Sequence, residues 1–160
     1  MTGAIAVGAL AAAPAANAFR LSDGSSIQCV VRGVAAREYA APADDPIMRD
    51  RTGMTFPEGK GYATAWNMTK LAALPPAVHD FLFFHECAHA LIPTSNELAA
   101  NCGGLKDMRA AGRAGPTVEG KLAAFFGAGN AYWESTVKCA DRPPNPADPP
   151  GTLAVPRPPG

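Results

Sequence analysis

One stretch decides the fold expected for this chain: Phe81-Leu82-Phe83-Phe84-His85-Glu86-Cys87-Ala88-His89-Ala90-Leu91-Ile92. Pro75 and Pro76 come shortly before it and suit the start of a helix. Pro93 follows it directly and cannot continue a helix. The sequence therefore predicts a helix from about Pro76 to Ile92.

Two histidines of this helix belong to an H-E-x-x-H motif, His85 and His89. Each helical residue turns about 100°, so the two side chains lie about 40° apart on one face, one turn apart along the axis. Two imidazoles placed in this way can hold one zinc ion. Glu86 lies beside that face, where its carboxylate can take a proton from the attacking water. The alternative is that both histidines are ordinary buried residues bonded to backbone carbonyls.

A catalytic zinc site also needs a third protein ligand and an open position for water. Glu97 is the only carboxylate soon after the motif, and Pro93 lets the chain reverse there. A second helix, from about Ser95 to Ala111, can then bring Glu97 over the two histidines. The alternative is a capping box, in which Thr94 is the N-cap and Glu97 folds back onto the backbone. Gly103-Gly104 indicates that either another backbone passes close to this helix or the helix breaks.

These residues resemble the gluzincin-type metallopeptidases, whose pattern is H-E-x-x-H followed by E-x-x-A-D; the matching residues are His85, Glu86, His89, Glu97 and Ala100. The stretch from about Leu74 to Cys102 is similar to a group of small secreted bacterial H-E-C-x-H proteins. The resemblance implies an α+β, zincin-like domain, with the zinc-motif helix packed on a short sheet beside two further helices.

The same resemblance implies the chemistry of the site. One Zn²⁺ per chain would be bound by His85, His89 and Glu97. Glu86 would act as the general base in the hydrolysis of peptide bonds, and the partner would be a peptide or protein substrate.

Asn101 departs from the family pattern, which usually has Asp at this position. That Asp typically orients a ligand histidine by accepting its other N–H. The Asn101 carbonyl can accept the same bond without charge, so the ligand's basicity should fall. This departure supports a second hypothesis, an exported zinc-binding protein that does not catalyse hydrolysis. A third hypothesis is a purely structural domain held by two disulfides.

Length and charge set the broad class. The chain has 160 residues, which predicts one domain, here residues 19–141. Lys plus Arg and Asp plus Glu both number 14, so no net charge favours nucleic acid or an anionic membrane. Residues 142–160 are rich in proline and poor in apolar side chains, which predicts a disordered tail.

The first 18 residues are small and apolar and end in Ala16-Asn17-Ala18, an A-x-A cleavage pattern. We expect a signal peptide over residues 1–18, cleaved before Phe19, and a periplasmic or secreted protein without stable membrane association. The alternative is a membrane anchor, although the stretch is shorter than the ~20 residues that span a bilayer.

Export predicts that the four cysteines pair, because the compartment is oxidising. Four cysteines allow three connectivities. We expect Cys87–Cys102, which would join the two helices of the zinc site, and Cys29–Cys139, which would join the ends of the domain. Cys102 as a zinc ligand is the alternative, whereas Cys87 points away from the histidine face.

The remaining segments are read from local patterns. Ile27–Val31 and Tyr62–Asn67 are predicted strands, and the segment from Ala40 to Gly61 is predicted to be mostly loop. By the family resemblance, Tyr62–Asn67 is assigned to the edge of the active cleft; the alternative is a strand that simply packs on the helix. A third helix is expected over about Thr117–Gly127, with a buried face made by Leu122, Phe125 and Phe126. The candidates for stabilising an oxyanion are Tyr62, Arg113 and Tyr132.

Overall fold

The protein is described from a computed structural model, which covers residues 18–42, 44–127 and 129–143. The predicted signal peptide, apart from Ala18, and nearly all of the predicted tail lie outside the described residues. The described part is an α+β domain, as the sequence predicts. Among its helices, none has the length and apolar composition needed to cross a membrane.

The main sheet has three strands in the order β5 (Arg37–Ala41), β7 (Gly61–Asn67) and β6 (Gly53–Glu58). The central strand β7 pairs in parallel with β5 and antiparallel with β6. Two small antiparallel hairpins precede this sheet; their strands are β1 (Phe19–Arg20), β2 (Ser26–Ile27), β3 (Val30–Val31) and β4 (Val34–Ala35).

Three of the local predictions need correction, two for strands and one for a loop. The strand predicted at Tyr62–Asn67 is formed as β7; Tyr62 lines the cleft, but β7 is the central strand of the sheet, so an extended substrate cannot add to it. The edge strand β6 lies within Ala40–Gly61, which was predicted to be mostly loop. Its exposed Pro57 fits only an edge, because proline has no N–H to donate to a second neighbour. The strand predicted at Ile27–Val31 is divided between β2 and β3.

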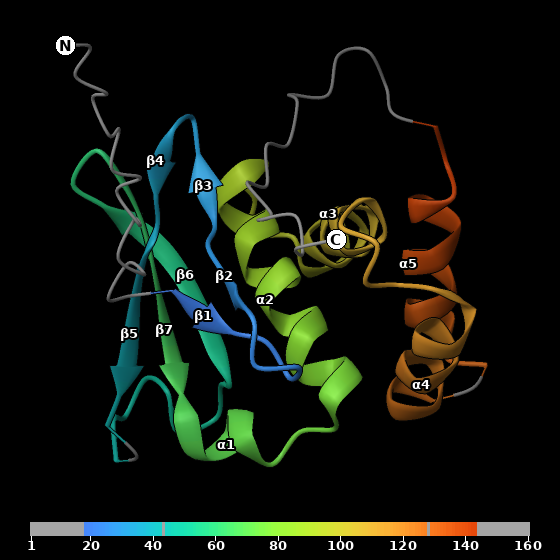
Figure 1. Ribbon diagram of the computed structural model, residues 1–160, viewed down its shortest axis with the longest axis horizontal. Coiled ribbons are helices and arrows are strands. Elements are labelled where there is room, and N and C mark those ends of the chain that lie inside the picture. The colour runs from blue at the N-terminus through green and yellow to red at the C-terminus, as the bar shows by residue number, and fades with distance from the viewer. Residues whose placement is uncertain (1–17, 43, 128, 144–160) are drawn as a thin grey trace, which may run out of the picture.

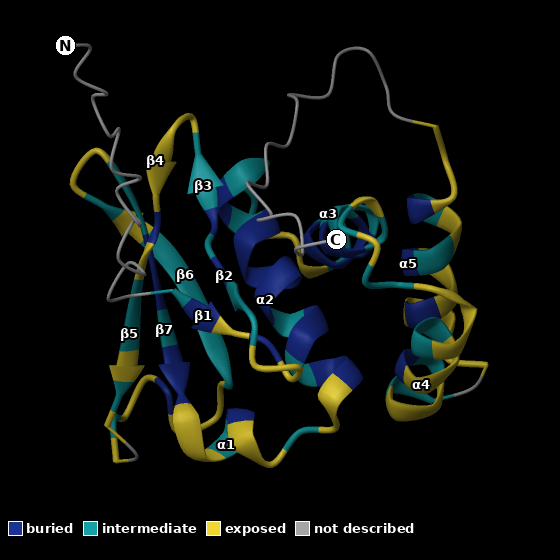
Figure 2. Cartoon of the chain, viewed as in Figure 1, coloured by how far each residue is buried: buried dark blue, intermediate teal, exposed yellow. Residues whose placement is uncertain are grey.

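Helix α2 (Pro76–Leu91) lies in the middle of the domain, between the sheet and the remaining large helices (Figure 1). Pro76 occupies its first turn, and the Ile92 N–H ends it by donating to the Ala88 carbonyl at 3.1 Å. Figure 2 shows that α2 is buried along most of its length. A helix covered on both sides is apolar all round, which explains the aromatic run Phe81–Phe84.

The other helices are α1 (Met68–Ala72), α3 (Glu97–Ala110), α4 (Pro116–Phe126) and α5 (Ala131–Ala140). Phe126 stacks on Trp133 with ring centroids 5.0 Å apart, and Phe81 meets both rings edge-on. Leu122 is buried as predicted. Phe125 is 48% exposed, so its predicted burial is wrong: α4 covers the domain from outside and keeps one face in solvent.

The four cysteines form two disulfides, which confirms that they pair, but the predicted partners are wrong. The observed bonds are Cys29–Cys87 and Cys102–Cys139. Cys87 lies about 200° around the helix from His85, so its sulfur faces the amino-terminal hairpins and not α3. Cys102 lies on the side of α3 that meets α5. Because its sulfur is bonded to Cys139, Cys102 is excluded as a metal ligand.

Candidate metal centre

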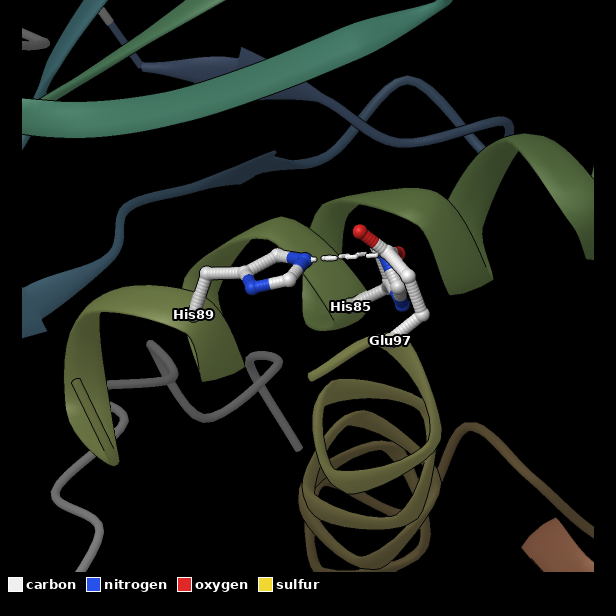
Figure 3. Close-up of side chains that lie close together, drawn as sticks. All are labelled: His85, His89 and Glu97. Carbon is white, nitrogen blue, oxygen red and sulfur yellow. Dashed lines mark hydrogen bonds and ion pairs between the residues drawn. The ribbon is translucent and has the colours of Figure 1, made fainter. Parts of the chain in front are cut away.

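Helices α2 and α3 bring together the three predicted ligand side chains (Figure 3). His85 Nε2 lies 3.2 Å from His89 Nε2, and Glu97 Oε2 lies 3.1 Å from the first and 3.6 Å from the second. Neighbouring ligand atoms of a tetrahedral zinc ion, bound at about 2.0–2.1 Å, lie about 3.3 Å apart. Two imidazoles and a carboxylate at these separations could hold a metal ion.

The loop between the helices aims Glu97 at the histidines. Asn96 is the N-cap of α3, and its side chain accepts the Ala99 N–H at 3.0 Å. Thr94 Oγ1 accepts the Asn96 N–H at 3.0 Å. The capping box with Thr94 as N-cap is therefore not formed. Glu97 is the first residue of α3, and its carboxylate meets the histidines.

Gly104 lets α3 approach α2 closely. A Cβ at this position would lie 2.8 Å from His85 N and 2.9 Å from His85 Cα. Of the two alternatives for Gly103-Gly104, the close backbone is therefore correct, and the helix continues unbroken to Ala110. This close contact holds the start of α3 over the histidine face.

Each histidine has a distinct neighbour at its Nδ1. His89 Nδ1 lies 2.7 Å from the Thr94 carbonyl, which can only accept, so Nδ1 carries the proton and Nε2 presents its lone pair to the site. His85 Nδ1 is buried without a hydrogen bond of ordinary geometry. Asn101 is buried on α3 and acts to raise the pKa of His85, but no hydrogen bond joins it to His85 Nδ1, so its orienting role stays a prediction.

The pKa of His85 is lowered, first because burial disfavours the imidazolium and second because His89 lies beside it. Glu97 and Asn101 oppose this effect only in part. A lowered pKa keeps the imidazole neutral, which is the form that binds a metal ion.

Glu86 points from α2 toward strand β6. Burial raises the pKa of its carboxyl, and hydrogen bonds from Thr55 partly offset the effect. A Cβ at Gly53 would lie 2.8 Å from Glu86 Oε1 and 2.7 Å from Trp66 Cζ3. The missing side chain at Gly53 thus makes room for the carboxylate. The sequence analysis missed both Gly53 and Thr55. The available signal for Gly53 was a glycine at the start of a strand-like segment, where another part of the chain can approach the backbone closely.

The ligand group opens into a cleft of about 850 Å³ between β6, α2 and the loop before α3. Glu86 and all three ligands line it, together with Gly53 and Thr55 of β6. The side of β6 that does not pair with β7 borders this cleft. A cleft of this volume is large enough to hold several residues of a peptide.

The three candidates for oxyanion stabilisation differ in position. Tyr62 lines the cleft. Arg113 is turned away and binds Asp23 at 3.0 Å and Ser25 at 2.8 Å. Tyr132 is 42% exposed, and its pKa is raised by burial and by the Glu97 charge. Of these three candidates, Tyr62 is the one that lines the cleft.

Comparisons with protein-family models, with curated proteins and with solved structures found no match for this chain. The resemblance to gluzincin-type enzymes stays a prediction made from the motif residues.

Proposed function

We propose that this chain is an exported zinc-dependent metallopeptidase that hydrolyses peptide bonds. The observation that carries the proposal is the arrangement of two imidazole nitrogens and one carboxylate oxygen at 3.1–3.6 Å from one another. This donor set matches catalytic zinc sites with two histidines and a glutamate. The buried carboxylate of Glu86 lies beside it in the same cleft.

In this proposal three residues bind the metal ion and a fourth transfers the proton. His85 and His89 would hold the ion through Nε2, and Glu97 through Oε2. A zinc ion in this position would lower the pKa of water toward about 7 and polarise a peptide carbonyl. Glu86 accepts the proton of the attacking water and passes it to the leaving nitrogen. Burial raises the pKa of its carboxyl, so Glu86 holds a proton more readily than an exposed carboxylate does.

The shape of the cleft supports a peptide or protein substrate. The free side of β6 has backbone donors and acceptors that an extended chain can pair with, as in strand addition. This assigns to β6 the cleft-edge role that the sequence assigned to Tyr62–Asn67. Pro57 limits the pairing to the part of β6 before it.

Two disulfides indicate a non-reducing environment of the extracellular type. A periplasmic or secreted enzyme, released by cleavage after residue 18, fits this environment and is part of the proposal. It requires neither nucleic acid nor membrane as a partner.

Metal content is the first test. Mass spectrometry of the purified protein should find about one zinc per chain, and His85→Ala should lose it. Glu97→Ala should weaken zinc binding, and unchanged affinity would remove Glu97 from the site. Glu86→Gln should keep the zinc and lose hydrolysis of a denatured protein substrate.

One observation favours a second function, zinc binding without hydrolysis: the group beside His85 is the neutral amide of Asn101. That function predicts one zinc per chain and no hydrolysis even in the unaltered protein. An Asn101→Asp variant would separate the two functions, because restored charge should raise activity only in a true enzyme.

A further inference from the structure

A second cavity, of about 260 Å³, is lined in part by Trp66 and is called here the amino-terminal cavity. It is lined by Ala18, Phe19, Arg20, Glu38, Tyr39, Ala40, Trp66, Met68, Leu71 and His79. Its walls are largely apolar and aromatic, and Glu38 is its one carboxylate among the described residues. The metal site makes no use of it.

Glu38 is a half-buried carboxylate that lacks a positive partner. One of its oxygens accepts the indole N–H of Trp66, and the other, Oε1, is buried without a hydrogen bond. Burial raises the pKa of this carboxyl to about 7. A carboxylate in such a place is stabilised when a cation and further donors reach it.

The basic side chains around the cavity are already engaged. Arg20 donates to the Gly24 carbonyl at 2.9 Å, and His79 Nδ1 lies 3.0 Å from Asp80. Glu86, the other charged group that acts on Glu38, is negative and raises the pKa further. Neither of these two basic side chains is therefore a free cation for Glu38.

Phe19 is firmly placed at this cavity. It is 5% exposed, and its ring lies 4.8 Å from Trp66, 5.0 Å from His79 and 5.1 Å from Phe83. Phe19 also directly follows Ala16-Asn17-Ala18, the predicted cleavage pattern. The expected first residue of the cleaved chain is therefore a buried residue beside Glu38.

Cleavage would change the charge at this point. Hydrolysis of the Ala18–Phe19 bond consumes one water and leaves a carboxylate on Ala18 and an ammonium on Phe19. Leu21 N–H donates to Ser25 O at 2.9 Å, so by the alternation of antiparallel pairs Phe19 N–H is in register to donate to Ile27. An ammonium keeps that bond and has two further protons for the cavity.

We propose that the amino-terminal cavity is the docking site for the α-ammonium group of Phe19, formed by cleavage of the Ala18–Phe19 bond, with Glu38 as its ion-pair partner. The uncleaved chain lacks this charge, so the cleaved chain is the more stable one. Trp66 bonds to Glu38 and also borders Gly53 beside Glu86, so the ion pair supports one wall of the cleft. The proposal does not depend on a metal ion.

The test compares two chains that both end at Gly160 and contain every described helix and strand. One begins at Phe19, and the other carries a Gly-Ser extension before Phe19; each is prepared with Glu38 and with Glu38→Gln. In the Phe19 form the NMR-determined pKa of Glu38 should fall below about 4.5, and in the extended form it should stay near 7. Glu38→Gln should raise the unfolding constant at least tenfold in the Phe19 form only.

Two control variants sharpen the test. Glu58→Gln alters a carboxylate of the same sheet that binds Arg37 and Tyr39, so its effect should be equal in both forms. Arg20→Gln should leave the Glu38 pKa of the Phe19 form low. The proposal is overturned if Glu38 titrates alike in both forms, or if Arg20→Gln restores a pKa near 7. It is also overturned if the exported protein, by intact mass, does not begin at Phe19. Zinc content is measured in parallel, so failure here is separate from failure of the metal site.

Discussion

The two sides of Glu86 are built in different ways. On one side, α2 and α3 are consecutive helices, and their ligands lie within the short segment from His85 to Glu97. On the other side, Gly53 of β6 and Trp66 of β7 come from strands earlier in the chain. The positions of the side chains on the helical side follow from residue spacing along one helix and one turn. The strand side exists only after strands distant in sequence have paired.

The two sides therefore differ in how well their contacts can adjust to a larger side chain. At Gly104 the neighbours are backbone atoms of His85, which cannot move without displacing α2. At Gly53 the neighbours are side-chain atoms of Glu86 and Trp66, which can shift without displacing a backbone segment. We expect changes on the helical side to reduce stability and changes on the strand side to reduce activity. The predictions below test this expectation.

The largest effect is expected from removing a disulfide. Replacing both Cys102 and Cys139 by Ser opens a loop of 37 residues, and replacing both Cys29 and Cys87 opens one of 58. The chain-entropy model gives a loss of about 4 kcal/mol in the free energy of unfolding for either pair. Only the first pair anchors α3, so it should weaken zinc binding more. Urea unfolding and zinc titration measure both effects; equal zinc affinities would contradict the distinction.

The next effect is expected at Gly104→Ala. The added Cβ meets the His85 backbone at 2.8 Å, and overpacking of this kind costs about 2 kcal/mol even after the helix propensity gained. Gly120→Ala in α4 is the matched control, because its Cβ would meet nothing within 4 Å and should gain up to about 1 kcal/mol. Thermal or urea unfolding compares them. Similar gains in both variants would mean that α3 does not press on α2.

A smaller loss of stability, about 1 kcal/mol, is expected for Gly53→Ala because side chains can adjust. Glu86 must then move, so hydrolysis should fall at least tenfold while zinc content stays the same. Gly61→Ala in β7 is the control, since its Cβ would meet only Val34, at 3.3 Å. Full activity in Gly53→Ala would show that the strand side does not position Glu86.

The smallest effect concerns pH and Asp107 of α3. Burial raises its pKa from 3.8 to about 6, so the folded chain binds more protons than the unfolded chain between these values. The stability from this group is present below about pH 4 and is lost as the pH rises through about 6. Asp107→Asn should flatten this dependence and stabilise the protein at pH 7 by about 1 kcal/mol, because the side chain is only partly buried. Urea unfolding at several pH values measures it; an unchanged slope would place Asp107 in solvent.

The predictable part of the protein is the part that depends on local spacing. Proline residues marked the start and end of α2, and the i, i+4 spacing placed His85 and His89 on one face. Glu97 was found because a reversal after Pro93 leaves few carboxylates that can return to that face. The capping-box alternative failed because Asn96 is the N-cap and leaves the Glu97 carboxylate free.

The features that the sequence did not predict depend on contacts between segments far apart in the chain. Strand β6 carries Gly53 and Pro57, which read as loop signals when the pairing with β7 is not known. Phe125 belongs to an outer helix, and its exposure depends on what that helix covers. Thr55 has no signature in the sequence, because its role follows only from facing Glu86 across the cleft.

Local sequence is enough to predict helix α2, its turn into α3 and the three candidate ligand side chains, because a helix is set by contacts between residues three and four apart and its ends by prolines and caps. The three-dimensional fold is needed to see which cysteines pair, which strand borders the cleft and where Phe19 is buried. These features depend on segments far apart in the chain, whose positions are set by shared burial around α2 and by strand pairing. No local pattern records that arrangement.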